Sequence, residues 1–184
     1  LLAEKNGDTI STAANTKFTD IPAHAWYSGY VKYLSNNGIT YGKSKTVFAP
    51  NDAITRAEFT TMAVRFFDVY GSGDAEIMEQ FSGFNDVSSG YWAAEYIKYA
   101  ALHGWINGYG DGSFHADREI NRAEVVTIVN RLLGREADED YIADNLRKLN
   151  TFPDVSRKHW AYYAVMEAAN AHTAVLGESE SWSK

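Results

Sequence analysis

Two arginines occupy the same place in two copies of a short motif. Arg56 lies in the run Ile-Thr-Arg-Ala-Glu at residues 54–58, and Arg122 lies in the run Ile-Asn-Arg-Ala-Glu at residues 120–124. Each run predicts a helix with arginine at its first position, where the positive end of the helix dipole disfavours a cation by about 0.3–1 kcal/mol. Unpaired helix amides and a planar guanidinium suit a carboxylate or a phosphate, which the guanidinium can bind through two hydrogen bonds. The motif therefore indicates an anion-binding site at each arginine.

The same runs predict how each helix begins. Thr55 and Asn121 are good N-terminal caps, and Glu58 and Glu124 follow three positions later as the returning half of a capping box. We therefore assign these four residues to helix capping rather than to ligand contact. The buried faces of the two helices would consist of Phe59, Met62, Ala63 and Phe66 in the first and Val125, Ile128, Val129 and Leu132 in the second.

The arginine motif is part of a longer repeat. An Asp follows a Phe by two positions, and a Trp follows that Phe by eight, in three places: Phe18, Asp20 and Trp26; Phe84, Asp86 and Trp92; and Phe152, Asp154 and Trp160. Between the first two copies the match runs from the Phe through the arginine motif at a constant spacing, without an insertion. Chance does not produce so many coincidences, so the chain contains internal repeats.

Each repeat predicts a helix, a loop and a second helix. Residues with the spacing of one buried helical face follow the first two tryptophans: Tyr30, Val31 and Leu34, and then Tyr96, Ile97 and Ala100. Gly38 and Gly104 suit the left-handed position after a last helical turn. The next glycines, Gly42 and Gly108, suit a tight loop.

The three aspartates of the repeat allow two interpretations. Asp20, Asp86 and Asp154 lie a few residues before a predicted helix, so they could cap that helix or brace a loop. They could also contact a ligand or orient an arginine. Each arginine could in turn pair with one of these carboxylates from a neighbouring repeat, and it would then join the repeats instead of binding a ligand.

The three tryptophans also allow two interpretations. Trp26, Trp92 and Trp160 could offer a flat apolar face to a sugar ring, or each could begin the buried face of the helix that follows. Tyr109 lies beside a loop, so we expect it to be exposed and available for sugar stacking or hydrogen bonding. Gly108 begins a glycine-rich run, residues 108–112, which suits a tight turn better than a phosphate-binding or calcium-binding loop.

Composition excludes several classes of function. The 184 residues include 17 Lys and Arg against 24 Asp and Glu, for a net charge of -7, so the chain lacks the broad cationic field that nucleic-acid binding requires. There are no cysteines, which excludes disulfides, thiolate nucleophiles and cysteine-bound zinc. No apolar run approaches the roughly 20 residues that cross a bilayer, so we expect no membrane insertion.

Nothing in the pattern singles out a catalytic group. The recurring carboxylates are equivalent copies, whereas glycoside hydrolysis needs two carboxylates in distinct environments. The 5 histidines share no repeat position, and no HExxH, GxSxG or Walker-type motif occurs. We therefore expect a non-enzymatic chain without a cofactor or a metal site.

The order of these residues resembles the S-layer homology (SLH) repeat of bacterial cell-surface proteins. The resemblance rests on Phe-x-Asp followed by Trp, on Gly-x-x-x-Gly, on Asp-Gly-x-Phe and on Ile-Thr-Arg-Ala-Glu, and it covers nearly the whole chain. It implies an all-α fold of tandem helix-loop-helix SLH repeats in a pseudo-threefold arrangement. The expected organisation is the tail of a preceding repeat plus a linker at 1–16, repeats at 17–70 and 83–135, linkers at 71–82 and 136–150, and a truncated or degenerate repeat at 151–184. The second linker could hold a short helix through Tyr141, Leu146 and Leu149.

The resemblance also implies a function. SLH repeats bind secondary cell-wall polysaccharide, often bearing pyruvate ketals, in grooves between adjacent repeats, and so tether the parent protein non-covalently to the wall at the cell surface. The alternatives are peptidoglycan binding and a structural module that oligomerises in a surface layer without binding glycan. Domain swapping would follow if a helix of one chain completed the unfinished third repeat of another.

The expected grooves combine neighbouring repeats. One would contain Arg56 with Asp86 and Trp92, and the other would contain Arg122 with Asp154 and Trp160. The full set of glycan-binding candidates is Arg56, Arg122, Asp20, Asp86, Asp154, Trp26, Trp92, Trp160, Tyr109 and Gly108. No Arg-Ala-Glu run follows in the third repeat, so a groove that needs its second helix should be weak or absent.

Overall fold

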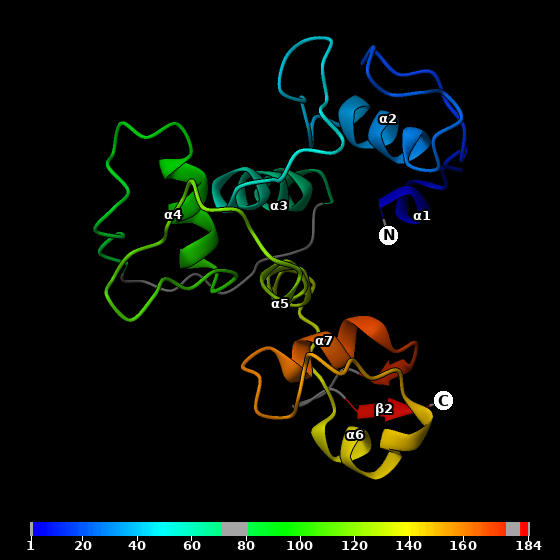
Figure 1. Cartoon of the computed structure of the whole chain (residues 1–184), viewed down its shortest axis with the longest axis vertical. Coiled ribbons are helices and arrows are strands. Elements are labelled where there is room, and N and C mark those ends of the chain that lie inside the picture. The colour runs from blue at the N-terminus through cyan, green and yellow to red at the C-terminus, as the bar shows by residue number, and fades with distance from the viewer. Residues whose placement is uncertain (1, 71–80, 176–180, 184) are drawn as a thin grey trace. The chain divides into compact units, whose positions relative to one another are not determined.

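The computed structural model describes residues 2–70, 81–175 and 181–183 of the chain, and these residues are mainly helical (Figure 1). In order they form α1 (Leu2–Asn6), α2 (Ser28–Asn36), α3 (Arg56–Tyr70), α4 (Ala94–Leu102), α5 (Arg122–Leu132), α6 (Glu139–Asn145), the 3-10 helix η1 (Leu146–Lys148), α7 (Tyr162–Ala169), β1 (Thr173–Val175) and β2 (Ser181–Ser183). The helical class predicted from the sequence is confirmed. The short antiparallel pair of β1 and β2 is an addition that the repeat pattern does not predict. Most of the predicted linker 71–82 lies outside the described residues.

The chain divides into two compact units. The first unit comprises Leu1–Ile54 with Thr61–Ala75, and the second comprises Thr55–Thr60 with Glu76–Lys184. The division falls inside α3, so the first turn of this helix belongs to the second unit. The pseudo-threefold arrangement stays a prediction.

An aspartate braces the loop of the first repeat. The carboxylate of Asp20 accepts hydrogen bonds from the backbone amides of Phe48, at 2.9 Å, and Ala49, at 2.6 Å. Ala49 has a φ of 60°, a left-handed conformation that costs energy for a residue with a Cβ. Phe48 also packs on the core of this repeat, which Phe18, Ile21 and Val31 form. The carboxylate therefore holds a strained loop against its own core.

The second repeat uses the same brace. Asp86 accepts hydrogen bonds from the amides of Phe114 and His115, both at 2.7 Å, and His115 has a φ of 55°. Burial would raise the pKa of Asp86, but the two amides hold it below its usual value. Hydrogen bonds from Phe48 and Ala49 lower the pKa of Asp20 in the same way. In both repeats the contact observed is therefore loop bracing, one of the two interpretations that the sequence allows.

Glycines shape the loop that precedes this brace. Gly38 and Gly104 have φ values of 72° and 69° and follow the last turns of α2 and α4, as predicted. Gly108 is constrained by space instead, because a Cβ there would lie 2.5 Å from the Phe84 ring and 2.6 Å from the carbonyl oxygen of Ser113. The close approach of the loop backbone to the core ring thus requires glycine at position 108.

The second helix of each repeat begins where the motif predicts. The amide of Glu58 donates to the Thr55 hydroxyl at 3.2 Å, and the amide of Thr55 donates to the Glu58 carboxylate at 2.8 Å. Asn121 and Glu124 form the same reciprocal pair at the start of α5.

The predicted buried faces of the helices are wrong at two positions. Val129 is 37% exposed and Tyr30 is 47% exposed, because each lies away from the side of its helix that the buried residues occupy.

The predicted third repeat, residues 151–184, contributes one helix of its pattern, α7 (Tyr162–Ala169), to the described part of the chain. Its helix α7 packs against α5, where the buried Asn130 donates a hydrogen bond to the carbonyl of Ala164 at 3.0 Å. A separate core then forms from Ile142 of α6, Tyr162 and Met166 of α7, and Trp182 of β2. Helix α6 lies in the predicted linker 136–150, at the place expected for a short helix. No helix in the described part of the chain is long and apolar enough to cross a membrane.

The contact at Gly108 leads to a prediction about stability. Gly108→Ala should destabilise the fold by about 1–3 kcal/mol, because the new methyl group would overlap the Phe84 ring and a backbone carbonyl. Gly110→Ala in the same loop is the matched control, since a Cβ at Gly110 meets nothing within 4 Å, and its effect should stay within about 0.5 kcal/mol. Urea unfolding followed by tryptophan fluorescence measures both. Equal stabilities of the two variants would contradict the packing argument.

Candidate functional site

The first turn of α3 is docked on the loop of the second repeat. The amide of Arg56 donates to the carbonyl of Arg118 at 2.9 Å, and the amide of Ala57 donates to the carbonyl of Ala116 at 2.9 Å. Thr55 and Glu119 form an isolated antiparallel bridge beside them. These backbone contacts satisfy amides that a helix start leaves without intrahelical partners. They also fix the direction in which the Arg56 side chain leaves the helix.

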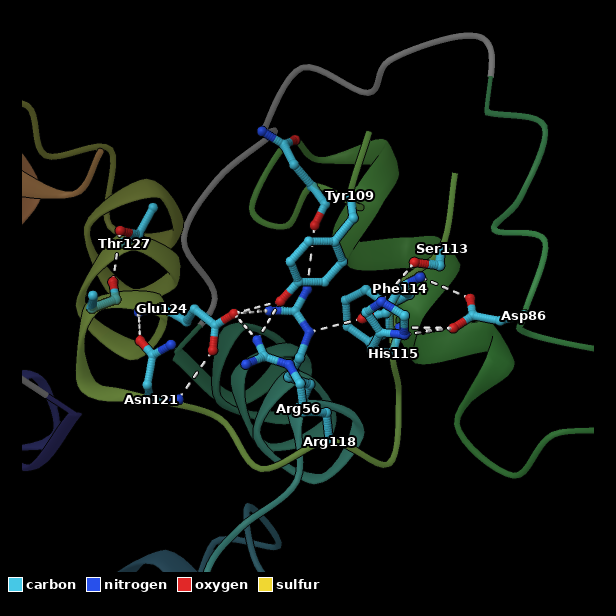
Figure 2. Close-up of polar contacts among 12 residues, drawn as sticks. Arg56, Asp86, Tyr109, Ser113, Phe114, His115, Arg118, Asn121, Glu124 and Thr127 are labelled. Atoms are coloured by element: carbon cyan, nitrogen blue, oxygen red, sulfur yellow. Dashed lines mark hydrogen bonds and ion pairs between the residues drawn. The ribbon is translucent and has the colours of Figure 1, made fainter. Parts of the chain in front are cut away.

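The Arg56 guanidinium is buried and bound to protein acceptors (Figure 2). Its Nε donates to the carbonyl of Phe114 at 2.8 Å, and one Nη donates to the carbonyl of Asn107 at 3.3 Å. The other Nη pairs with the carboxylate of Glu124 at 2.7 Å. The guanidinium carbon also lies 4.4 Å from the ring centre of Phe114, which adds a cation–π contact. Only 5% of the residue is exposed, so most of its bonding capacity is used inside the protein.

Glu124 is the centre of a polar cluster, which we call the Glu124 cluster and which consists of Arg56, Tyr109, Arg118 and Glu124. One carboxylate oxygen pairs with both arginines and accepts a hydrogen bond from the Tyr109 hydroxyl at 2.8 Å. The other oxygen accepts from the Asn121 amide at 3.0 Å and so caps α5. Arg118 also contacts the Tyr109 hydroxyl. A single carboxylate therefore caps one helix and anchors the first residue of another.

The surroundings of Glu124 keep it ionised. Burial would raise the pKa of its carboxyl group, but the Asn121 amide, the Tyr109 hydroxyl and the two guanidinium groups stabilise the charged form and hold the pKa below its usual value. Burial and the hydrogen bond to Glu124 raise the pKa of Tyr109, so this phenol stays protonated and acts as a donor. The cluster thus contains two guanidinium cations for one carboxylate.

A pocket of about 320 Å³ lies beside the Glu124 cluster, and we call it the Trp160 pocket. Its lining residues come from α3, from the loop after α4, from α5 and from the segment before α7: Arg56, Trp105, Ile106, Asn107, Gly108, Tyr109, Glu124, Thr127, Ile128, Arg131 and Trp160. Trp160 is 65% exposed although it lines this pocket. The pocket therefore combines an open aromatic face with cationic and hydrogen-bonding side chains.

The pocket unites some of the predicted site residues and leaves others apart. Arg56, Gly108, Tyr109 and Trp160 line it together, whereas Arg122 is exposed and does not line it. Asp86 and Trp92 were expected beside Arg56, and Asp154 beside Trp160, but none of these three lines the pocket. Asp20 and Trp26 belong to the first unit. Arg56 does pair with a carboxylate of the next repeat, as the alternative interpretation proposes, but the partner is Glu124 rather than an aspartate.

The tryptophans of the repeat are not core residues. Trp26, Trp92 and Trp160 are 76%, 56% and 65% exposed. Each lies just before its helix begins, so the helical spacing that links it to a buried face does not apply to it. The interpretation that they begin a buried face is therefore wrong, and their flat faces are open to solvent.

Sequence reasoning missed two arginines of the site. Arg131 lines the Trp160 pocket from the last turn of α5. The sequence did contain a signal for a role of Arg131, because Arg65 occupies the same position in the first repeat. Arg118 has no such counterpart, because Asp52 occupies the equivalent place in the first repeat. Glu124 was assigned to capping alone. Among the described residues, no group of three His, Asp or Glu side chains could hold a metal ion.

These features define a module of tandem helical repeats in which a buried arginine of one repeat is bound by the next. Residues 17–60 and 83–126 match the S-layer homology domain, and the chain therefore carries two S-layer homology domains.

Similar proteins come from bacterial cell surfaces. Over 94% of its length the chain is 31% identical to cell surface glycoprotein 1 of Acetivibrio thermocellus and spans 7% of that protein. It is 29% identical to the cellulosome-anchoring protein of the same organism, over 94% of this chain and 37% of that protein. It is 33% identical to an amylopullulanase of Thermoanaerobacterium thermosulfurigenes, over 83% of this chain but only 8% of that enzyme. The chain thus corresponds to a small part of longer proteins. The family and its relatives assign the chain to the bacterial cell surface.

The buried ion pair leads to a prediction that separates the two equivalent arginines. Arg56→Ala should cost about 3–5 kcal/mol of stability, because it leaves the Glu124 carboxylate buried without its main partner. Arg122→Ala removes the same side chain from the same repeat position, but Arg122 is exposed, so its effect should stay within about 0.5 kcal/mol. Urea unfolding of both variants gives the comparison. Equal losses would mean that the arginines have equivalent environments.

The lowered pKa of Glu124 leads to a prediction about acid stability. A carboxyl group whose pKa is lower in the folded than in the unfolded chain stabilises the fold above its unfolded pKa, and this contribution disappears as the pH falls through the folded pKa. Glu124→Gln should therefore be less stable than the unchanged chain at pH 7, and the difference should shrink steadily below pH 4.5, the usual value for Glu. Unfolding free energies measured between pH 7 and pH 2 test this. A difference that stays constant over that range would show that the charge of Glu124 does not matter.

Proposed function

We propose that the chain anchors its parent protein to the cell wall by binding an anionic sugar of the secondary cell-wall polysaccharide in the Trp160 pocket. The observation that carries this proposal is the 65% exposed indole of Trp160 on the wall of a pocket that also contains Arg131. An aromatic face with a few convergent polar groups is the usual chemistry of a saccharide or small-molecule site. S-layer homology domains and cell-surface relatives support wall binding as the biological setting.

The charges in the pocket support an anionic ligand. Glu124 neutralises Arg56 at 2.7 Å, and Arg131 then adds a further positive charge. The Arg131 side chain is exposed at the surface, yet the protein around it removes enough water to lower the pKa of its guanidinium. Arginine stays protonated in spite of such a shift, so Arg131 is a fixed cation with donors for a carboxylate. A pyruvate ketal on a sugar presents such a carboxylate.

Arg56 acts in this proposal as a positioning residue. Its guanidinium holds the carbonyl groups of Asn107 and Phe114 and the Glu124 carboxylate, and so fixes the loop that carries Tyr109. Tyr109 is 38% exposed, and its ring lines the pocket. The preformed wall reduces the entropy that a sugar would otherwise lose on ordering the site.

The electrostatics of the carboxylates support binding rather than hydrolysis. A glycosidase needs a carboxylic acid whose pKa is raised, so that it can donate a proton to the leaving group. Glu124, the carboxylate of this pocket, has a pKa below its usual value, and the pKa values of Asp86 and Asp20 are lowered as well. These groups hold structure in their ionised form.

Wall binding is tested by co-sedimentation with Gram-positive cell-wall sacculi, before and after acid removal of the secondary polysaccharide. The unchanged chain should bind intact sacculi and lose binding after extraction. Trp160→Ala and Arg131→Ala should each weaken binding about tenfold, through loss of the stacking face and of a charge-assisted hydrogen bond. Binding that survives extraction would point to peptidoglycan and overturn the choice of polymer.

The matched controls are Trp26→Ala and Arg122→Ala. Trp26 holds the repeat position of Trp160, and Arg122 is a second exposed arginine of α5. Neither residue lines the Trp160 pocket. Both variants should bind sacculi like the unchanged chain. Equal losses in the controls and in the pocket variants would place the binding site elsewhere.

A further inference from the structure

A second depression lies next to the Trp160 pocket in the same unit. We call it the Asp117 pocket, and it measures about 560 Å³. Its lining residues are Asp86, Tyr91, His115, Ala116, Asp117 and Arg118. The function proposed above makes no use of it.

Two side chains connect the two pockets. Arg118 lines the Asp117 pocket, and its guanidinium contacts Tyr109 and Glu124, which line the Trp160 pocket. The ring of His115, another lining residue of the Asp117 pocket, lies 4.8 Å from the ring of Tyr109. Figure 2 shows Tyr109 between Glu124 on one side and His115 on the other. The side chains around Tyr109 therefore form a wall between the two pockets.

The two pockets differ in charge. The Trp160 pocket has the additional cation Arg131. The Asp117 pocket contains the carboxylates of Asp86 and Asp117, while Arg118, the one arginine among its described lining residues, is paired with Glu124. A second anionic sugar would be repelled there, whereas the hydroxyl groups of a neutral sugar would find acceptors.

The polar groups of the Asp117 pocket suit hydroxyl donors. The Tyr91 hydroxyl donates to the Asp117 carboxylate at 2.6 Å, and burial together with this bond raises the pKa of Tyr91 to about 12. Asp117 is exposed, so its carboxylate can accept further hydrogen bonds from solvent or a ligand. The ring of Trp92, 56% exposed, lies 5.8 Å from the Tyr91 ring and extends the aromatic surface beside the pocket.

We propose that the Asp117 pocket is a second glycan subsite, which binds a neutral sugar adjacent to the anionic sugar in the Trp160 pocket. This inference rests on the proposed function and deepens it. The chain would recognise at least two linked sugars of different charge, and it would discriminate against a polymer with anionic groups on adjacent sugars. Charge complementarity at one subsite and charge repulsion at the other would together determine specificity.

The test uses size-fractionated fragments released by acid from secondary cell-wall polysaccharide, and it compares a single anionic sugar with fragments of two or more sugars by titration calorimetry. The longer fragments should bind the unchanged chain about fivefold to tenfold more tightly, as expected for one or two additional hydrogen bonds. His115→Gly and Asp117→Ala should lose most of this gain and bind the single sugar normally. His115→Gly keeps the backbone intact, because glycine adopts the φ of 55° without strain.

The matched control is Ala49→Gly, at the same loop position of the first repeat, where φ is 60°. It should bind both kinds of fragment like the unchanged chain. Equal affinity of the unchanged chain for short and long fragments would overturn the second subsite and leave the proposed function intact. The second subsite would also be overturned if His115→Gly and Asp117→Ala still bound the longer fragments more tightly than the single sugar by the full factor. If no fragment binds the unchanged chain, the proposed function itself fails.

Discussion

The pairing of Arg56 with Glu124 is the interaction on which the rest of the second unit depends. Arginine at the first position of a helix is disfavoured by the helix dipole, by about 0.3–1 kcal/mol. The Glu124 carboxylate at 2.7 Å reverses that preference, and the carbonyl groups of Phe114 and Asn107 satisfy further donors. A buried ion pair adds little net stability over an apolar contact of the same size, but it is costly to break and tolerates only one geometry. The pair therefore fixes the register between the end of the first repeat and the loop of the second.

Glu124 connects the contact between the two repeats to the Trp160 pocket, because its two carboxylate oxygens bind different partners. One oxygen caps α5 through the Asn121 amide, and the other binds Arg56, Arg118 and Tyr109. The start of α5, the start of α3 and the aromatic wall of the pocket are thus held by one carboxylate. The amide bonds of Asp86 to residues 114 and 115 hold the same loop from its other side. A rigid loop with an exposed tyrosine is a suitable surface for a ligand that gains little energy from each contact.

The sequence predicted local structure better than it predicted the site. The caps of α3 and α5 and the glycine after α4 depend on neighbours in the chain, so motif and spacing were sufficient for them. The contact between Arg56 and Glu124 joins residues 68 positions apart, and nothing in a local pattern identifies such a partner. The sequence left the exposure of Trp160 open for a different reason. It lies outside its helix, where the helical period no longer determines which side chains are buried. The equivalence of the repeats was also misleading. Arg56 and Arg122 share a motif, but within the described residues the loop of a following repeat binds Arg56 and not Arg122.

The region predicted as a third repeat contributes to the pocket through the segment before its described helix, α7. Helix α7 packs on α5, with Asn130 bound to the carbonyl of Ala164, and the segment before α7 carries Trp160 to the pocket wall. The remainder of the described C-terminal region builds a different core around Met166 and Trp182, which contains no equivalent of α3 or α5. A repeat can place its tryptophan on the pocket wall with only the segment before its first helix. To bind the arginine of the preceding repeat, it also needs its loop and its second helix, as Phe114 and Glu124 show for Arg56. Among the described residues, nothing after α7 forms an equivalent of the loop and second helix that hold Arg56, so Trp160 lines a pocket while Arg122 stays exposed.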